Sequence, residues 1–325
     1  MNTNQIEFKL ARPEQWYQEL SKKLPAVVQN NKLVFNAEFG SGGQEFLEVQ
    51  PGLWGQKLTF TLLHDLELCR MPNAKNDFFQ IDFYLSNADI TSVINNKTIT
   101  RNFETVNMAL TSSMLASKIH IPANKAVNVF NVLISKEWLF NNVIPDYENL
   151  REFFSYNTPI YLSENLDYRL KDLVKRIDFG HSNKITSMSI IIQIVDYLFL
   201  KFGGRELFKN KTGIHTRDFE QLAKIREQLD ANPQQEILLT DLASGAGMSL
   251  SKFKRLFKQV FGTTPYKYHL QNKMEKAMET LKQGEYSVSE TGFLLGYSNL
   301  SQFSKAFKNQ FGVLPRDVKP IHTID

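Results

Sequence analysis

Two stretches of the sequence, separated by 50 residues, carry side chains that could bind nucleic acid. In both stretches hydroxyl, amide and cationic groups surround an apolar stripe, and no acid occurs between Ser249 and Gly262. Arginine can bind guanine with two hydrogen bonds, glutamine can bind adenine, and lysine and hydroxyl groups bind phosphate. The candidate DNA-binding residues are Ser249, Ser251, Lys252, Lys254, Arg255, Lys258, Ser298, Asn299, Ser301, Gln302, Ser304, Lys305 and Lys308.

The elements that position these side chains are predicted from a repeat. Five positions of the first stretch recur in the second with one constant offset: Phe253, Phe257, Phe261, Gly262 and Pro265 match Phe303, Phe307, Phe311, Gly312 and Pro315. Self-similarity at a fixed offset indicates a structural unit used twice. Each copy predicts a short supporting helix, a turn at glycine and a second, amphipathic helix. The candidate capping residues are Thr240 or Asp241, Ser249 or Ser251, and Ser298 or Asn299.

A single amphipathic helix with four cations is usually a solvated surface helix. Two copies with the same plan favour a pair of helix-turn-helix units that read a major groove. Between them, residues 265–284 predict a helix that begins at Pro265 and ends at Gly284, of which about 16 residues form a rod of roughly 24 Å.

Residues 239–319 resemble the DNA-binding domain of the AraC/XylS family of bacterial transcription regulators. The resemblance is carried by both copies, and above all by the run Gly-Tyr-Ser-Asn-Leu-Ser-Gln-Phe-Ser-Lys-Ala-Phe-Lys-Asn-Gln-Phe-Gly-Val-Leu-Pro at 296–315. Two departures, Gly245 and Thr291-Gly292, weaken the supporting helices, because glycine costs about 1 kcal/mol relative to alanine inside a helix. The resemblance implies double-stranded DNA as a partner. It also places Ser251, Lys254, Arg255, Lys258, Ser301, Gln302 and Lys305 toward the groove, and Ser249, Ser298 and Lys308 toward phosphates.

Composition describes an ordinary globular protein, with 42% hydrophobic and 22% charged residues. Residues 221–325 hold 14 Lys and Arg against 10 Asp and Glu, whereas the first 220 residues hold 24 of each. The excess of positive charge therefore falls in the part assigned to DNA. A single cysteine, Cys69, is compatible with a reducing cytoplasm. No signal peptide is evident at Met1, and the apolar segment 190–202 is expected to be a buried helix and not a membrane span.

The first 145 residues contain short alternating apolar runs between Gly, Pro, Asn and Ser, a pattern typical of an antiparallel sandwich or barrel. The family resemblance implies a cupin-like β-barrel here. His64 and His120 are isolated, and no nucleophile or phosphate-loop motif is present, so we expect no metal, no cofactor and no enzyme activity. Aromatic residues could line a pocket for an apolar ligand or simply form the core: Trp54, Phe60, Phe79, Phe83 and Phe130.

Residues 146–208 change to helical periodicity, with helices expected at 146–156, 163–177 and 187–202. By family resemblance, 166–202 is a candidate dimer interface; burial within one chain is the alternative. A polar connection at 209–215 leads to the third part, 216–325.

The sequence thus predicts an α+β multidomain protein: a cupin-like antiparallel barrel at 1–145, a helical segment at 146–208, and an all-α domain with two helix-turn-helix motifs at 216–325. The expected function is a cytoplasmic, sequence-specific transcription regulator, an activator that contacts RNA polymerase and senses a small molecule. Two alternatives stay open: an architectural or constitutive DNA-binding protein without effector, and an enzyme fused to a DNA-binding module.

Overall fold

The structure is a computed structural model that describes residues 4–94, 97–103, 107–164, 166–180, 183–203, 216–261 and 263–320. The chain divides into two compact units, Met1–Lys201 and Phe202–Asp325. The predicted separation of 146–208 from the β-rich part stays a prediction. The predicted connection at 209–215 lies outside the described residues.

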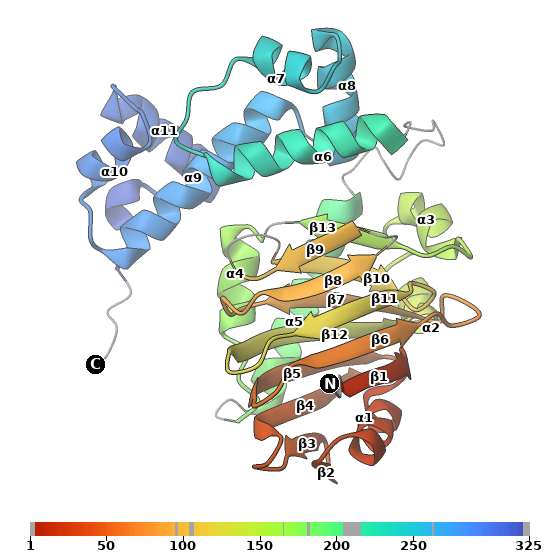
Figure 1. Cartoon of the computed structure of the whole chain (residues 1–325). Helices are drawn as coiled ribbons and strands as arrows, with labels where there is room; N and C mark the ends of the chain where they lie inside the picture. Colours follow the sequence, from red (N-terminus) through yellow and green to blue (C-terminus); the bar gives the residue numbers. More distant parts are fainter. Residues whose placement is uncertain are drawn as a thin grey trace. The chain divides into compact units, whose positions relative to one another are not determined.

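The first unit is built mainly from β-strands, with one helix, α1 (Pro13–Lys23), near its start (Figure 1). The strands are β1 (Asn4–Lys9), β2 (Ala26–Gln29), β3 (Lys32–Phe35), β4 (Gly40–Gln50), β5 (Leu53–Leu62), β6 (Leu66–Met71), β7 (Phe78–Tyr84), β8 (Ile90–Ile94), β9 (Lys97–Arg101), β10 (Met108–Ser112), β11 (Ser117–Ile121), β12 (Ala126–Ser135) and β13 (Tyr161–Glu164). The single strand expected over 98–110 is thus two, β9 and β10.

These strands form two separate sheets. One has the order β1-β6-β11-β8-β9 and the other the order β13-β10-β7-β12-β5-β4-β3-β2. The predicted antiparallel pairing is found throughout except between β1 and β6, which are parallel. The predicted closed barrel needs correction, because closure requires the first and last strands of a sheet to pair, and both sheets here are open.

Strand alternation gives the larger sheet two different faces. On β7, Phe79 and Phe83 face the helices of this unit: Phe79 lies 5.0 Å from Phe154 and Phe83 stacks on Phe130 at 5.9 Å between ring centroids. The opposite face packs toward the smaller sheet, where Trp54 and Phe60 join the main apolar core. The five aromatic residues considered as one pocket lining therefore lie on both faces, as expected when side chains alternate along a strand.

Helices follow the last long strand: α2 (Lys136–Asn142), α3 (Arg151–Ser155), α4 (Tyr168–Lys175) and α5 (Lys184–Gly203). The helix expected at 146–156 is a 3-10 turn, Glu148–Leu150, followed by the short α3. The helix expected at 163–177 starts later, because Ser163 pairs with Ala109 as part of β13. Asp167 instead caps α4 and accepts a hydrogen bond of 3.0 Å from the Leu170 amide.

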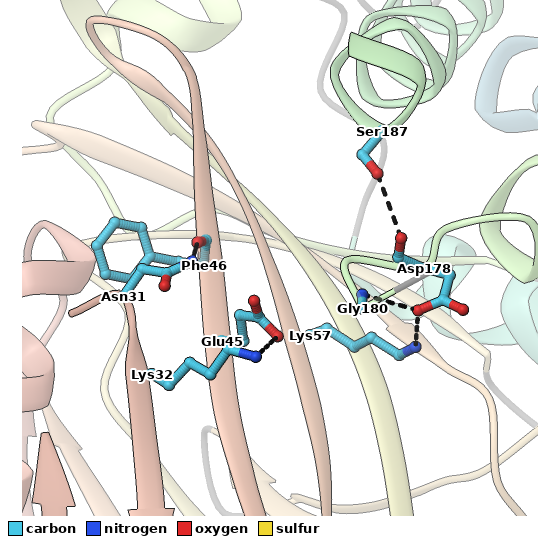
Figure 2. Close-up of polar contacts among 8 residues, drawn as sticks. All are labelled: Asn31, Lys32, Glu45, Phe46, Lys57, Asp178, Gly180 and Ser187. Carbon is cyan, nitrogen blue, oxygen red and sulfur yellow. Dashed lines mark hydrogen bonds and ion pairs between the residues drawn. The ribbon is translucent and has the colours of Figure 1, made fainter. Parts of the chain in front are cut away.

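Helix α5 packs closely on the larger sheet through Gly55, where an added Cβ would lie 2.5 Å from Cδ1 of Ile191. The loop before it is tied to β5, since Nζ of Lys57 lies 3.8 Å from Oδ1 of Asp178 (Figure 2). With 20 residues, α5 is longer than expected, and by length and composition alone it could cross a membrane. Core helices pass the same test, and Ile191, Ile194 and Leu198 are buried here.

The second unit is helical in its described part (Figure 1). Its helices are α6 (Thr216–Ala231), α7 (Leu239–Gly245), α8 (Leu250–Phe261), α9 (Pro265–Gln283), α10 (Val288–Leu294) and α11 (Leu300–Phe311). Helix α6 packs on α8 and α9, and α9 contacts α8, α10 and α11. The predicted helices of this part are present, and α9 exceeds the expected 16 residues with 19.

Candidate nucleic-acid interface

Two helix pairs of the second unit, α7–α8 and α10–α11, have cores of the same design. In α8 the ring centroids of Phe253 and Phe257 lie 5.6 Å apart, and those of Phe257 and Phe261 4.5 Å. In α11 the equivalent phenylalanines, each 50 residues later, lie 6.0 and 4.8 Å apart. The repeat in the sequence therefore corresponds to a repeat in the packing.

The turns within the two pairs are also alike. Gly247 and Gly296 adopt positive φ angles of 65° and 78°, which glycine tolerates best. The amide after each glycine donates to a carbonyl five residues back, from Met248 to Ala243 at 2.9 Å and from Tyr297 to Gly292 at 3.0 Å. This is the pattern that ends a helix with a left-handed glycine. The second turn is one residue longer, since Gly296 follows Gly247 by 49 residues and not by 50.

The caps at the starts of these helices agree only in part with expectation. Thr240 and Asp241 lie inside the first turn of α7, whose cap position is Leu238 without a side-chain bond. Ser249 accepts a hydrogen bond of 3.3 Å from the Lys252 amide at the start of α8. Asn299 caps α11 and accepts hydrogen bonds from the amides of Ser301 and Gln302 at 2.9 and 3.2 Å.

Helix α8 presents a continuous polar face. Ser251, Lys254, Arg255 and Lys258 are exposed, and their spacing of three and four residues places them along one side of the helix. Lys254 and Arg255 take part in no hydrogen bond or ion pair with the residues that the structure describes. Their cationic groups are therefore available to a partner.

Lys252 differs from its neighbours because it is held within the unit. Its Nζ lies 2.9 Å from Oδ2 of Asp218 in α6, and the Asp218 side chain is mostly buried. This contact links α8 to the helix that precedes the repeat. The sequence gave no signal for it, because an acid 34 residues away carries no periodic relation to α8.

Helix α11 presents the corresponding face with fewer charges. Ser301, Lys305 and Lys308 are exposed at positions equivalent to Ser251, Arg255 and Lys258, and Ser304 is half-buried. Gln302 is exposed but occupies the position equivalent to Lys252, about a quarter turn from Ser301. Ser298 is exposed in the turn before the helix.

Helix α10 supports α11 through a cap and a close approach. Ser287 accepts from the Glu290 amide at 3.2 Å while Glu290 accepts from the Ser287 amide at 2.8 Å, a reciprocal capping box. The hydrogen bonds to Ser287 lower the pKa of Glu290. At Gly292 an added Cβ would lie 2.7 Å from Cδ2 of Leu300, so glycine permits the two helices to approach.

A buried polar group that the sequence did not reveal fixes α6 to α9. Oδ1 of Asp230 accepts hydrogen bonds from Tyr268 at 2.8 Å and Asn272 at 2.7 Å. Arg226 lies 3.8 Å from the other oxygen of Asp230 and packs over the ring of Phe261 at 5.6 Å. Carboxylates with several donors of this kind are strong anchors, so α6 is part of the scaffold that positions α8.

Two basic groups of α9 lie near the second helix pair. Burial and the adjacent charge of Lys273 lower the pKa of His269, and burial lowers the pKa of Lys273. The Lys273 ammonium lies 5.7 Å from the ring centroid of Tyr297, in the turn before α11. A cation over an aromatic face stabilises this arrangement.

Comparison with known proteins places this part of the chain in a family. Residues 242–320 match the family model described as a helix-turn-helix domain. Over 98 residues the chain is 36% identical to the uncharacterized HTH-type transcriptional regulator YidL of Escherichia coli K12, covering 30% of this chain and 33% of the relative. Over 91 residues it is 31% identical to the probable transcriptional regulator LumQ of Photobacterium leiognathi, covering 28% of this chain and 37% of the relative.

Among solved structures, the chain is similar to a transcriptional regulator from Chromobacterium violaceum, described among AraC-type DNA-binding domain-containing proteins. The identity is 31%, the TM-score is 0.29, and the match covers 30% of this chain and 88% of that one. The chain spans about a third or less of the length of curated relatives such as YidL (33%) and the Pseudomonas aeruginosa regulator ArgR (27%). At its carboxyl end the chain carries a helix-turn-helix domain of the AraC/XylS family.

Proposed function

We propose that the whole chain is a sequence-specific DNA-binding regulator of transcription, in which α8 and α11 each enter a major groove. The observation that carries this proposal is the pair of equivalent exposed faces, Ser251-Lys254-Arg255-Lys258 and Ser301-Ser304-Lys305-Lys308, supported by repeated phenylalanine cores. A helix with hydroxyl and cationic groups on its exposed side suits the donor and acceptor pattern of a major groove.

The two faces differ in the contacts they offer. Arg255 is assigned to a guanine, because its planar group can bind O6 and N7 together. Gln302 is assigned to an adenine at the start of α11. Ser249, Ser298 and Lys308 are assigned to phosphates, which orient the domain without reading sequence.

Helix α9 sets the distance between the two faces. Its 19 residues give a rod of about 28 Å at about 1.5 Å per residue. Successive major grooves on one side of straight DNA are about 34 Å apart. We therefore propose that the bound duplex bends toward the protein, which adds a dependence on DNA flexibility to the sequence preference.

The test is selection of binding sites from randomised duplex oligonucleotides at physiological salt with the full chain. The expected result is an enriched site with two conserved blocks about one helical turn apart. The same selection with Lys224→Ala, which removes an exposed cation of α6, should return the same site. Enrichment of no sequence would contradict the proposal and favour an architectural DNA-binding protein.

The proposal extends to the first unit as a cytoplasmic signal-sensing domain and to RNA polymerase as a partner in activation. A small molecule bound by the first unit would shift the regulator between two states with different affinity for its site. Transcription in vitro from a promoter carrying the selected site tests the sign of regulation: more transcript with the protein supports an activator, and less transcript contradicts it.

We further propose that α5 pairs two copies of the chain. Its buried side packs on the sheet, but Ile185, Ile192 and Leu200 remain 78%, 44% and 55% exposed on the other side. Apolar side chains gathered on one helix face are typical of an interface between subunits. Sedimentation should show a dimer at micromolar concentration and a monomer for Ile192→Glu, with Gln193→Glu as the matched control. A monomeric unmodified chain would contradict this interface.

A further inference from the structure

The space between the two sheets of the first unit contains a polar row where an apolar layer is usual. Gln56, Asn131 and Asp82 are direct neighbours across β5, β12 and β7 of the larger sheet, and all three are buried. They lie on the face that carries Trp54 of the apolar core, opposite the face of Phe83. No hydrogen bond of the Gln56 side chain is found among the residues that the structure describes.

Two arginines of the smaller sheet reach into this space, and both are almost fully buried. Arg70 of β6 is 5% exposed and Arg101 of β9 is 3% exposed. Arg70 donates to Oγ1 of Thr111 at 2.9 Å and to the carbonyl of Ser112 at 2.8 Å. Both acceptors lie on β10 of the larger sheet, so Arg70 connects the two sheets across the interior.

Arg101 makes a similar connection at the edge of the sandwich. It donates to Oγ of Ser92 and, at 3.3 Å, to the hydroxyl of Tyr161. Its guanidinium also lies 5.5 Å from the ring centroid of Tyr161 and 5.8 Å from that of Tyr84. Since β9 and β13 are the edge strands of their sheets, Arg101 and the half-buried Tyr161 close this edge (Figure 1).

The charges of this arginine cluster (Arg70, Arg101, Asp82, Tyr84 and Tyr161) do not balance. Asp82 is the one carboxylate among the described residues that acts on both arginines, and it accepts a hydrogen bond of 2.6 Å from Gln80. Burial raises the pKa of Asp82 and lowers the pKa of Arg70 to about 10, so both guanidiniums stay protonated at neutral pH.

Each guanidinium has a donor to spare. The Nε atoms of Arg70 and Arg101 are buried and have no partner in the described part of the chain. A buried charge without a full set of partners is costly for stability. Such groups gather where a protein binds a ligand of opposite charge, and arginine suits a carboxylate because it can donate two parallel hydrogen bonds.

We propose that the arginine cluster binds a small organic anion, whose carboxylate lies between Arg70 and Arg101. The anion enters at the edge closed by Arg101 and Tyr161, and Gln56 and Asn131 are available to its other polar groups. This deepens the proposed signal-sensing role of the first unit by naming the class of ligand, and it replaces the apolar ligand that the aromatic residues suggested from sequence.

The test is thermal unfolding of the full chain, without DNA, in matched pairs of carboxylates and amides. The probes are acetate, benzoate, succinate and citrate, the amides of the first three, and inorganic phosphate. At least one carboxylate should raise Tm in a saturable way, because a ligand that binds only the folded state stabilises it. The corresponding amide should leave Tm unchanged. A rise with phosphate alone, with amides equally, or with no probe would overturn the proposal.

Three variants separate binding from a structural role. Arg70→Gln and Arg101→Gln should weaken the carboxylate's apparent affinity by roughly tenfold or more, since a hydrogen bond to a charged group is lost. Asp82→Asn should strengthen it, because the competing negative charge is removed. Lys118→Gln, on exposed β11 of the same sheet, is the matched control and should have no effect. A merely structural cluster would give no opposite effects from Asp82 and the arginines.

If the arginine variants unfold, Asp82→Asn and the unmodified chain still decide the question, since unchanged or weaker carboxylate binding by Asp82→Asn contradicts the proposal. The readout is independent of DNA. Failure to select a DNA site would therefore leave a carboxylate effect intact, and absence of that effect would leave the DNA-binding proposal intact.

Discussion

The ammonium of Lys252 lies 2.9 Å from Asp218, so one cation of α8 is directed to α6 and away from the exposed face. The ion pair fixes the start of α8 and removes one positive charge from the DNA-facing set. Asp218→Asn should release Lys252, raise nonspecific affinity for duplex DNA and steepen the salt dependence by about one counterion. Fluorescence anisotropy across a salt series measures this slope.

The control for this change is Asp241→Asn, which removes an exposed acid of α7 whose recorded side-chain contact is with Thr240. It should raise affinity slightly through net charge but leave the slope unchanged. Equal slopes for Asp218→Asn and the unmodified chain would show that Lys252 stays out of reach of the phosphates.

Arg255 and Lys308 are expected to respond differently when truncated. Arg255→Ala should cost about 1–3 kcal/mol at one base pair of the selected site and relax the preference there. Lys308→Ala should weaken binding to all sequences alike and reduce the salt slope by about one. Competition binding against single-base variants of the site separates the two patterns. Equal loss on every sequence from Arg255→Ala would refute its assignment to a base.

Two glycines of the supporting helices should respond in opposite directions to alanine. At Gly245 the nearest atom to an added Cβ is Cδ1 of Ile225 at 3.7 Å, an ordinary contact. Gly245→Ala should therefore stabilise the domain by about 0.5–1 kcal/mol through helix propensity. At Gly292 the added Cβ meets Leu300 at 2.7 Å and Phe303 at 3.1 Å, and Gly292→Ala should destabilise by about 1–3 kcal/mol. Urea unfolding of each variant gives both values, and a stable Gly292→Ala would indicate that α10 and α11 can separate without loss.

The stability of the helical unit should fall on mild acidification. Burial, with the charge of Lys273, holds the pKa of His269 below its ordinary value of 6.5. The unfolded chain therefore binds this proton first, and stability is lost as pH falls through 6.5 toward the folded pKa. Unfolding should shift to lower urea between about pH 7.5 and about pH 5.5, and His269→Gln should reduce that shift. The same shift in both proteins would assign the effect to other groups.

The helical unit could be predicted well because its information is local and repeated. Phe253, Phe257 and Phe261 recur as Phe303, Phe307 and Phe311, and the same spacing that marks a helix also marks its buried side. The ends of the helices were less certain. Thr240 and Asp241 have good capping side chains, yet they lie inside α7, because the helix starts earlier at Leu239.

The β-rich unit was harder because strand alternation does not say which strands are neighbours. The runs at β4, β5, β7 and β12 were found, but their division between two open sheets depends on contacts distant in sequence. Arg70 and Arg101 were not singled out, since charged residues are expected at the surface. Their burial follows from partners on other strands, Thr111 and Tyr161, which no local pattern connects to them.

Helix α9 packs against both α8 and α11, so each helix pair shares it as a common wall. On the proposed function, neither pair can turn about the duplex without carrying the other along. The operator must then keep its half-sites in rotational phase. Inserting about five base pairs between them, half of a turn of about 10 base pairs, places one half-site on the far side of the helix and leaves one pair without its groove.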